Sequence, residues 1–413
     1  MGGSAFTTGG RTLHTPRMPK SIYEHVKSKC HSILREHYTC VASPIEGPAK
    51  LDFGDIDILV AWPKEQAADT KAELEKIADL LDATDAILTE KKCSSNFAIP
   101  WPQELDGAGA EPETHQKHIQ VDVRVCPTLD HLQWILFKHA HGDIWSILGS
   151  TIRPFGLTLD DEALWLRIPE VEAFNKTMAK IFLTVEPAEV LRFLGLPIDD
   201  IWDVPFSSLK DMFEYVTECR MFRVLPQHIG ITQCEDLTVT TDDPRKLKSN
   251  DRRRMSKRPA FREWIDEFLP ECRREGRFLE RRTSRKEITR EAIERFNVGD
   301  EYSSRRRKLL LERQRDFIFR DVIKGAIPQP DHLDSRAMLF RGCQVKALKR
   351  IILEGDKSFG VQPEESLTDE DGLFNMKRVA KFIAKHKNEV GKAAIQLHQQ
   401  RYDVLKAREA DKP

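Results

Sequence analysis

Acidic residues occupy alternate positions in two stretches that each have the pattern of a β-strand. Residues 54–60 read Gly-Asp-Ile-Asp-Ile-Leu-Val, and residues 118–125 read His-Ile-Gln-Val-Asp-Val-Arg-Val. Because side chains alternate between the two faces of a strand, Asp55 and Asp57 are expected on one face above buried aliphatic residues, and Asp122 is expected on the corresponding face of the second stretch. If the two strands are neighbours, three carboxylates converge on one exposed patch. Hard oxygen ligands of this kind bind Mg²⁺, so the spacing predicts a divalent-metal site.

The length and composition place this site in a multi-domain intracellular protein. A chain of 413 residues is longer than a single hydrophobic core usually supports. Its 65 basic and 66 acidic residues give no global signal for a polyanionic partner. Eight cysteines without CxxC spacing argue against a zinc site and against a disulfide-stapled secreted fold. No apolar run is long enough for a membrane span, so we expect a protein of the nucleus or cytoplasm that does not enter a membrane.

The periodicity of residues 19–150 predicts a small mixed α/β unit. Its expected elements are, in order, a helix over 21–37, a strand over 38–43, the first acidic strand, a helix over 65–81, short strands over 88–91 and 96–99, and the second acidic strand. Residues 1–18 are rich in Gly, Ser and Thr, and we expect a disordered tail there. Their arginines and lack of acids also faintly resemble a transit peptide, so a mitochondrial location stays open.

The rest of the chain divides into three further regions. Residues 151–225 are expected to form a subdomain with a β-hairpin over 156–166 and a short helix over 187–196. Residues 226–250 are rich in turn residues and indicate a linker. From residue 251 to 413 the composition shifts to long, charged, amphipathic helices. The expected fold class is therefore α+β, followed by a mostly helical C-terminal region.

Several ordered motifs resemble the family X DNA polymerases, the polymerase-β-like branch of the nucleotidyltransferase superfamily. Residues 42–43 (Ala-Ser), 54–57 (Gly-Asp-Ile-Asp) and 121–124 (Val-Asp-Val-Arg) are similar to the family's Gly-Ser, Gly-Asp-hydrophobic-Asp and hydrophobic-Asp-hydrophobic-Arg motifs. Residues 156–165 resemble its Gly-Leu-Lys-Leu hairpin, and residues 186–197 its Leu-Gly-Leu segment. The resemblance covers about half of the chain and implies a palm with a mixed sheet and flanking helices, followed by a thumb-like subdomain.

The resemblance also implies roles for individual residues. Asp55 and Asp57 would bind two Mg²⁺ or Mn²⁺ ions, and Asp122 would bind the one that activates a 3′-hydroxyl. Such a pair serves in-line displacement at the α-phosphorus of an NTP or dNTP. Ser43 would contact the triphosphate, and Gly54 begins the acidic motif.

Two further residues belong to the implied nucleotide site. Arg124 would lie beside the carboxylates, although a structural ion pair is an equal alternative. Gly142 is the one match to the family's Tyr-Phe-Thr-Gly-Ser segment, so the nucleotide and sugar preferences do not carry over.

The phosphate-binding motif departs from the family in two places. Ala42 replaces the Gly before the serine, and Pro44 follows with no N–H to donate. Gly47 or Lys50 could compensate. The short stretch before the first helix has no room for the family's N-terminal lyase region, so we do not expect a processive repair polymerase.

Basic residues gather in residues 245–315, which hold 24 Lys and Arg against 13 acids. Such clustering favours binding of DNA or RNA through the phosphate backbone. The alternative is a set of solvated helices with internal ion pairs, because many arginines alternate with glutamates at helical spacing. An aromatic stripe at Phe261, Trp264 and Phe268 is interpreted as core and not as a base-stacking surface.

The leading hypothesis is a Mg²⁺-dependent nucleotidyltransferase acting on a nucleic-acid 3′ end. Two rivals stay open. One is a catalytically inactive protein with a palm fold that binds nucleic acid through its basic helices. The other is a nucleotidyltransferase that modifies a protein or a small-molecule hydroxyl.

Overall fold

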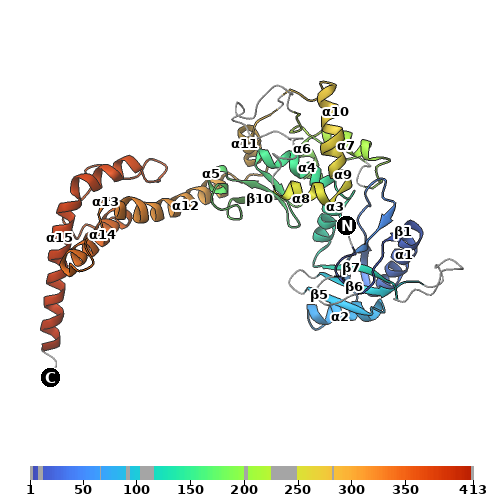
Figure 1. Ribbon diagram of the computed structural model, residues 1–413, viewed down its shortest axis with the longest axis horizontal. Helices are drawn as coiled ribbons and strands as arrows, with labels where there is room; N and C mark the ends of the chain where they lie inside the picture. Colours follow the sequence, from blue (N-terminus) through green and yellow to red (C-terminus); the bar gives the residue numbers. More distant parts are fainter. Residues whose placement is uncertain are drawn as a thin grey trace. The chain divides into compact units, whose positions relative to one another are not determined.

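The computed structural model describes residues 3–7, 13–65, 67–89, 94–102, 116–199, 203–224, 249–280 and 283–410. The chain divides into two compact units (Figure 1). One unit comprises Met1–Arg167 with Lys180–Val298, and the other comprises Ile168–Ala179 with Gly299–Pro413.

A five-stranded mixed sheet lies at the centre of the N-terminal half of the first unit. Its strands, in spatial order, are β2 (Tyr38–Ala42), β4 (Asp55–Pro63), β7 (His118–Cys126), β6 (Ser94–Pro100) and β5 (Asp85–Thr89). The β4–β7 pair is parallel, and the other neighbouring pairs are antiparallel. A separate two-stranded antiparallel sheet joins β1 (Met18–Pro19) to β3 (Asp52–Phe53). The mixed α/β prediction is confirmed.

Two helices cover one face of the five-stranded sheet. Apolar side chains of α1 (Lys20–His37) and α2 (Thr70–Leu80) form one hydrophobic core with the aliphatic side chains of β4 and β7. The alternation expected for β4 is present, because Ile56, Ile58 and Val60 are all at most 1% exposed. The opposite face is therefore left to the acidic side chains. The helix α3 (Leu129–His139) follows β7.

The prediction of a disordered tail is wrong for the described residues between 3 and 18. Phe6 is fully buried, and the backbone N–H of Ala5 donates to Gln120 Oε1 at 3.0 Å. Gly3 lies so close to the backbone of Gly54 that a Cβ atom on it would be 2.3 Å from the Gly54 carbonyl oxygen. Disorder was predicted because the segment has few apolar residues. One buried phenylalanine and hydrogen bonds from the backbone nevertheless attach it to the first unit.

A second sheet follows the first. Helix α4 (Ile144–Ile152) and a 3₁₀ turn, η3 (Arg153–Phe155), lead into three antiparallel strands, β8 (Leu157–Leu159), β9 (Leu164–Arg167) and β10 (Lys180–Thr184). Helices α6 (Pro187–Leu194) and α7 (Leu209–Thr217) come next. The predicted hairpin and the predicted short helix are both confirmed.

The helices that follow belong to the same unit, so the boundary predicted at residue 251 is wrong. They are α8 (Ser249–Lys257), α9 (Pro259–Glu263), the π-helix η5 (Trp264–Phe268), α10 (Leu269–Arg274) and α11 (Arg285–Arg295). The aromatic stripe is core, as expected, since Phe261 and Trp264 are fully buried and Trp264 stacks on Phe268 at 5.0 Å. Most of the predicted linker lies outside the described residues.

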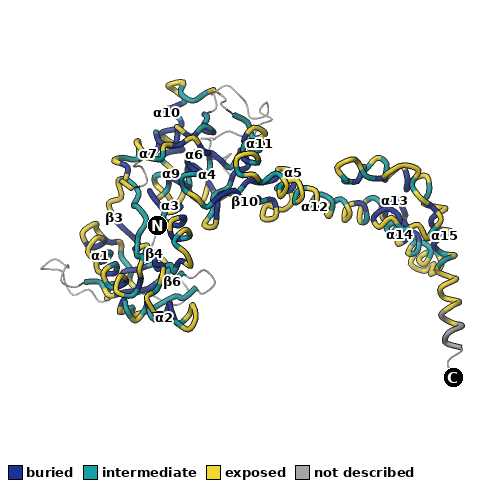
Figure 2. The backbone as a smooth tube through the Cα atoms, turned by 180° about the vertical axis from the view of Figure 1, so that it is seen from behind, coloured by how far each residue is buried: buried dark blue, intermediate teal, exposed yellow. Residues whose placement is uncertain are grey.

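The second unit is helical. It contains α5 (Pro169–Glu172), α12 (Gly299–Phe317), the π-helix η6 (Ile318–Ile323), α13 (Lys324–Ala326), α14 (Ser335–Glu354) and α15 (Met376–Ala410). Figure 2 shows that burial in this unit is concentrated where α14 and α15 pack together, whereas much of α12 is exposed. Over the described parts of both units, no helix is long and apolar enough to cross a membrane.

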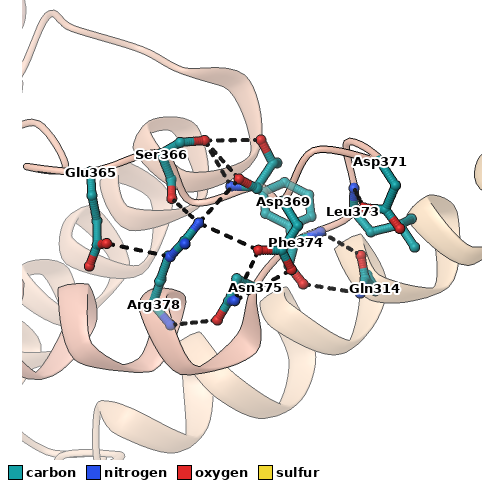
Figure 3. A network of polar contacts seen from close by, with 10 residues as sticks. Gln314, Glu365, Ser366, Asp369, Asp371, Leu373, Phe374, Asn375 and Arg378 are labelled. Atoms are coloured by element: carbon teal, nitrogen blue, oxygen red, sulfur yellow. Dashed lines mark hydrogen bonds and ion pairs between the residues drawn. The ribbon is translucent and has the colours of Figure 1, made fainter.

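The acidic segment between α14 and α15 is held by partners within the second unit. Arg378 lies 3.4 Å from a carboxylate oxygen of Glu365 and 3.5 Å from one of Asp369 (Figure 3). The Gln314 side chain accepts from the backbone N–H of Phe374 at 2.8 Å and donates to its carbonyl at 3.2 Å. The acids of this segment therefore attach it to α15, and the backbone of Phe374 attaches it to α12.

The attachment of the N-terminal segment can be tested with Phe6→Ala. We expect this change to lower the free energy of unfolding of the first unit by about 3 kcal/mol, because it empties a fully buried aromatic position. Urea denaturation measures the loss. Leu51→Ala is the control, since Leu51 is 87% exposed and its truncation should cost less than about 0.5 kcal/mol. Equal effects from the two variants would mean that the segment is not packed.

Candidate active site

The parallel pairing of β4 and β7 brings the predicted carboxylates together. Asp57 is paired with Asp122, and Asp55 is paired with Gln120. Paired residues on neighbouring strands point to the same face of a sheet, so all three carboxylates lie on the face opposite the α1–α2 core. The expected convergence of the two acidic strands is confirmed at the level of strand register.

The site carries negative charge that no ion pair balances within the described part of the chain. Burial raises the pKa of Asp57, and the charges of Asp55 and Asp122 raise it further. Solvent still reaches Asp57, although surrounding protein atoms displace much of its water. Burial also raises the pKa of Asp55, against the opposing effect of Lys50. Like charges held this close favour either a bound proton or a bound cation.

Asp122 is oriented by two amide donors. Its Oδ1 accepts from Asn96 Nδ2 at 2.6 Å and from Gln120 Nε2 at 2.8 Å. Burial raises the pKa of Asp122 to about 6 in spite of these hydrogen bonds, which lower it. Sequence reasoning missed Asn96, whose only signal was its position on an alternating strand that pairs with β7. The two amides fix Oδ1, and among the described residues no hydrogen bond reaches Oδ2.

The donor set suits a hard divalent cation. Three carboxylates without an internal counter-charge provide the oxygen ligands that Mg²⁺ or Mn²⁺ prefers. As the side chains stand, however, no three His, Cys, Asp or Glu residues in the described ranges are grouped closely enough to hold an ion. Binding of an ion would therefore have to bring the carboxylate groups closer together.

Ser43 lies at the end of β2 and is held by a histidine of α1. Its Oγ is 2.8 Å from His31 Nε2. Burial, followed by the nearby charges of Arg35 and Lys27, lowers the pKa of His31 to about 4. The imidazole is therefore neutral at physiological pH, and with Nε2 protonated it leaves the serine hydroxyl hydrogen free to donate outward. His31 was not recognised in the sequence because it lies on a different element, 12 residues before its partner.

Residues 43–51, which we call the cradle loop, pack against the turn that contains Gly142. His141 and Gly142 both have positive φ angles, of 54° and 62°. A Cβ atom on Gly142 would lie 3.4 Å from Gly47 Cα, and the His141 N–H donates to Ile45 O at 2.8 Å. Two residues predicted from the nucleotide-binding motifs, Ser43 and Gly142, thus lie on adjoining segments. Gly54 is buried under the N-terminal segment, which gives it a packing role.

Arg124 takes the ion-pair alternative. Its Nη2 lies 3.5 Å from Asp161 Oδ2, and His139 Nε2 lies 3.8 Å from the other carboxylate oxygen of Asp161. The contacts with His139 and Arg124 hold the pKa of Asp161 well below its usual range. Asp161 lies in the turn between β8 and β9, so this pair connects the second sheet to the acidic strand β7.

The basic region separates into paired and unpaired cations. Arg277, Arg295 and Arg306 each contact a glutamate. In α8, Asp251 is only 5% exposed and anchors the helix by accepting from Arg153 at 2.9 Å and from Arg254 at 2.5 Å.

The outward face of α8 keeps its positive charge. Arg252, Arg253 and Lys257 are exposed, and no ion pair involves them among the described residues. Arg258, directly after α8, donates to Asp143 in the turn that contains Gly142. The helix is thereby attached to the turn beside the cradle loop.

Comparison with protein families and curated sequences assigns no function to the site. No known family model and no curated protein sequence matches this chain. Function is therefore inferred from the chemistry of the site.

The charge of Asp122 can be tested through the pH dependence of stability. Its pKa is raised on folding, so its stabilising contribution is present below the ordinary carboxyl pKa and is lost as the pH rises through about 6. Asp122→Asn should therefore raise the free energy of unfolding by about 3 kcal/mol at pH 8 and by only about half as much at pH 5. Urea denaturation in EDTA measures both values.

Asp161→Asn is the control of opposite sign. The pKa of Asp161 is depressed on folding, so its contribution is present at pH 8 and is lost in acid. Its substitution should lower stability at pH 8. A loss of stability at pH 8 in both variants would contradict the account of Asp122.

Proposed function

We propose that this protein is a Mg²⁺-dependent nucleotidyltransferase with a polymerase-β-like palm, which transfers a nucleotide from an NTP or dNTP to a nucleic-acid 3′-hydroxyl. The observation that carries the proposal is the parallel register of β4 and β7, which sets Asp57 beside Asp122. Asp55, Asp57 and Asp122 would hold the ions, which when bound activate the hydroxyl and neutralise the departing pyrophosphate.

The protein's own groups would orient the reactants. Asn96 and Gln120 hold Oδ1 of Asp122, so that carboxylate does not have to be immobilised during the reaction. The Ser43 hydroxyl, positioned by His31, would donate to a phosphate oxygen. Gly47 and Gly142 let the two segments pack backbone against backbone, since a Cβ atom on Gly142 would already lie 3.4 Å from Gly47 Cα, so backbone of both segments would face the nucleotide there.

A nucleic-acid acceptor is supported by the position of α8. The helix presents three exposed cations and is attached through Arg258 and Asp143 to the turn beside the cradle loop. A phosphate backbone bound there would lie near the site without using the arginines that are already paired with glutamates.

One observation favours the inactive rival. The aspartates as they stand form no group of three suited to a metal ion among the described residues. Transfer of a nucleotide to a protein or to a small molecule is the other alternative, and the following experiment separates all three.

Purified protein should be incubated with Mg²⁺ or Mn²⁺, each labelled nucleotide, and either an oligonucleotide or no added acceptor. We expect label on the oligonucleotide, and a loss of at least about 10³-fold in Asp55→Asn and Asp122→Asn, because each change removes a metal ligand. Label on protein would support the protein-modifying alternative. No incorporation with any nucleotide, together with oligonucleotide binding that ignores both substitutions, would contradict the proposed activity.

The role of α8 predicts a change in salt dependence. Substitution of Arg252, Arg253 and Lys257 by Gln should reduce the slope of log K against log salt for oligonucleotide binding by about 2 to 3, since each lost phosphate contact removes about 0.9. Fluorescence anisotropy measures the slope. The matched control substitutes Arg274, Lys286 and Arg290, which are exposed cations of α10 and α11. Equal changes in both triple variants would leave α8 with no special role.

A further inference from the structure

The cradle loop contains one cation, and a carboxylate of the same loop holds it. Lys50 Nζ donates to Glu46 Oε2 at 2.6 Å, and Glu46 Oε1 accepts from the Tyr23 hydroxyl at 2.5 Å. The ammonium group also lies 4.6 Å from the centroid of the Phe53 ring, which stacks on Tyr23. Lys50 therefore has a defined position, set by a buried tyrosine on α1.

Both members of this pair act electrostatically on the candidate active site. Lys50 favours the charged form of Asp55, whereas Glu46 disfavours the charged forms of Asp55 and Asp57. Glu46 thus adds a further negative charge near Asp55 and Asp57. A triphosphate that approached the cradle loop would meet this charge and a lysine that is already occupied.

The pair can exchange partners readily. The side chains of Lys50 and Glu46 are 33% and 30% exposed, and ion pairs of this kind contribute little net stability. A triphosphate offers several anionic oxygens, and a lysine–phosphate hydrogen bond is charge-assisted. The loop is also short of backbone donors, because Pro44 and Pro48 have no N–H.

We propose that Lys50 is a triphosphate-binding residue that Glu46 holds in the free protein and releases when the polyphosphate arrives, so that Glu46 limits the affinity of the site. This inference rests on the proposed nucleotide-binding function. In this role the lysine makes the phosphate contact that backbone N–H groups would make in a loop with more free donors. Glu46 and Tyr23 then serve to position the lysine, and neither touches the phosphate.

The test is calorimetric titration with Mg²⁺–tripolyphosphate, which carries the phosphate chain without a base or sugar. Lys50→Ala should raise Kd about tenfold, and Lys50→Arg should stay within about twofold of wild type, because it keeps the charge. Glu46→Gln keeps an acceptor for Tyr23 but loses its charge, so it should lower Kd about threefold. Opposite signs for the two partners distinguish this role from a merely structural ion pair, whose loss would act in the same direction from either side.

A double variant separates release of Lys50 from general electrostatics. The gain in Glu46→Gln should vanish in Glu46→Gln combined with Lys50→Ala, because the two effects pass through one side chain. The matched control is the ion pair between Lys71 and Glu75 on α2. Its Nζ and Oε1 atoms are 3.5 Å apart, and both side chains are more exposed than those of Lys50 and Glu46. Lys71→Ala and Glu75→Gln should leave Kd unchanged, and thermal unfolding of every variant should match wild type within about 2 °C.

Three results would overturn the inference. They are an unchanged Kd in Lys50→Ala, weaker binding in Glu46→Gln, and a wild-type protein that does not bind Mg²⁺–tripolyphosphate. Failure of the proposed function has a different signature, since binding is measured without any transfer step. Tripolyphosphate binding that depends on Lys50, with no nucleotide incorporation, would keep the binding role and reject the transferase activity.

Discussion

Unbalanced negative charge on one face of the N-terminal sheet is the constraint on which the rest of the site depends. The parallel register of β4 and β7 places Asp57 beside Asp122, and it cannot be changed by one residue without moving the aliphatic side chains out of the core. Two nearby cations relieve this charge only in part, because other acids hold them. Asp161 holds Arg124, and Glu46 holds Lys50. Holding these carboxylates together costs stability at neutral pH, and in the proposed function a divalent cation would offset that cost.

The segments around the carboxylates are joined by specific contacts. The cradle loop is attached to α1 through Tyr23 and Glu46, and to the turn after α3 through His141 and Ile45. The N-terminal segment reaches Gln120, which in turn holds Asp122. Parts of the first unit that are far apart in sequence therefore fix one small region. Such connections provide the preorganisation that an active site needs.

Local patterns in the sequence predicted much of this unit. Alternation identified both acidic strands, and the glycine at residue 195 together with the proline at residue 187 marked the helix between them. Pairing of strands from separate parts of the chain was inferred from a resemblance, and the register now places the acids as expected. Contacts between distant elements left no local trace. The contacts of Asn96 and His31 could not be predicted, because a hydrogen bond across a sheet or from a helix has no fixed spacing in sequence.

Errors in the sequence reasoning arose where composition was used in place of contacts. The low hydrophobicity of residues 1–18 indicated disorder, yet Phe6 alone buries a full aromatic side chain. The charge-rich helices after residue 251 were expected to form one region with the C-terminus, although Phe261 and Trp264 bury them in the first unit. The arginines of this stretch could not be told apart in the sequence. Only the structure shows which of them pair with glutamates and which, on α8, are exposed without such a partner among the described residues.

A crystal structure grown with Mn²⁺ and recorded at wavelengths that give an anomalous signal would test the central claim most directly. The account expects an anomalous peak within about 2.0–2.3 Å of carboxylate oxygens from Asp55 and Asp57, with Asp122 turned toward it on the same face of the sheet. Mn²⁺ bound elsewhere in the molecule, with these three carboxylates still apart or paired with protein cations, would contradict it.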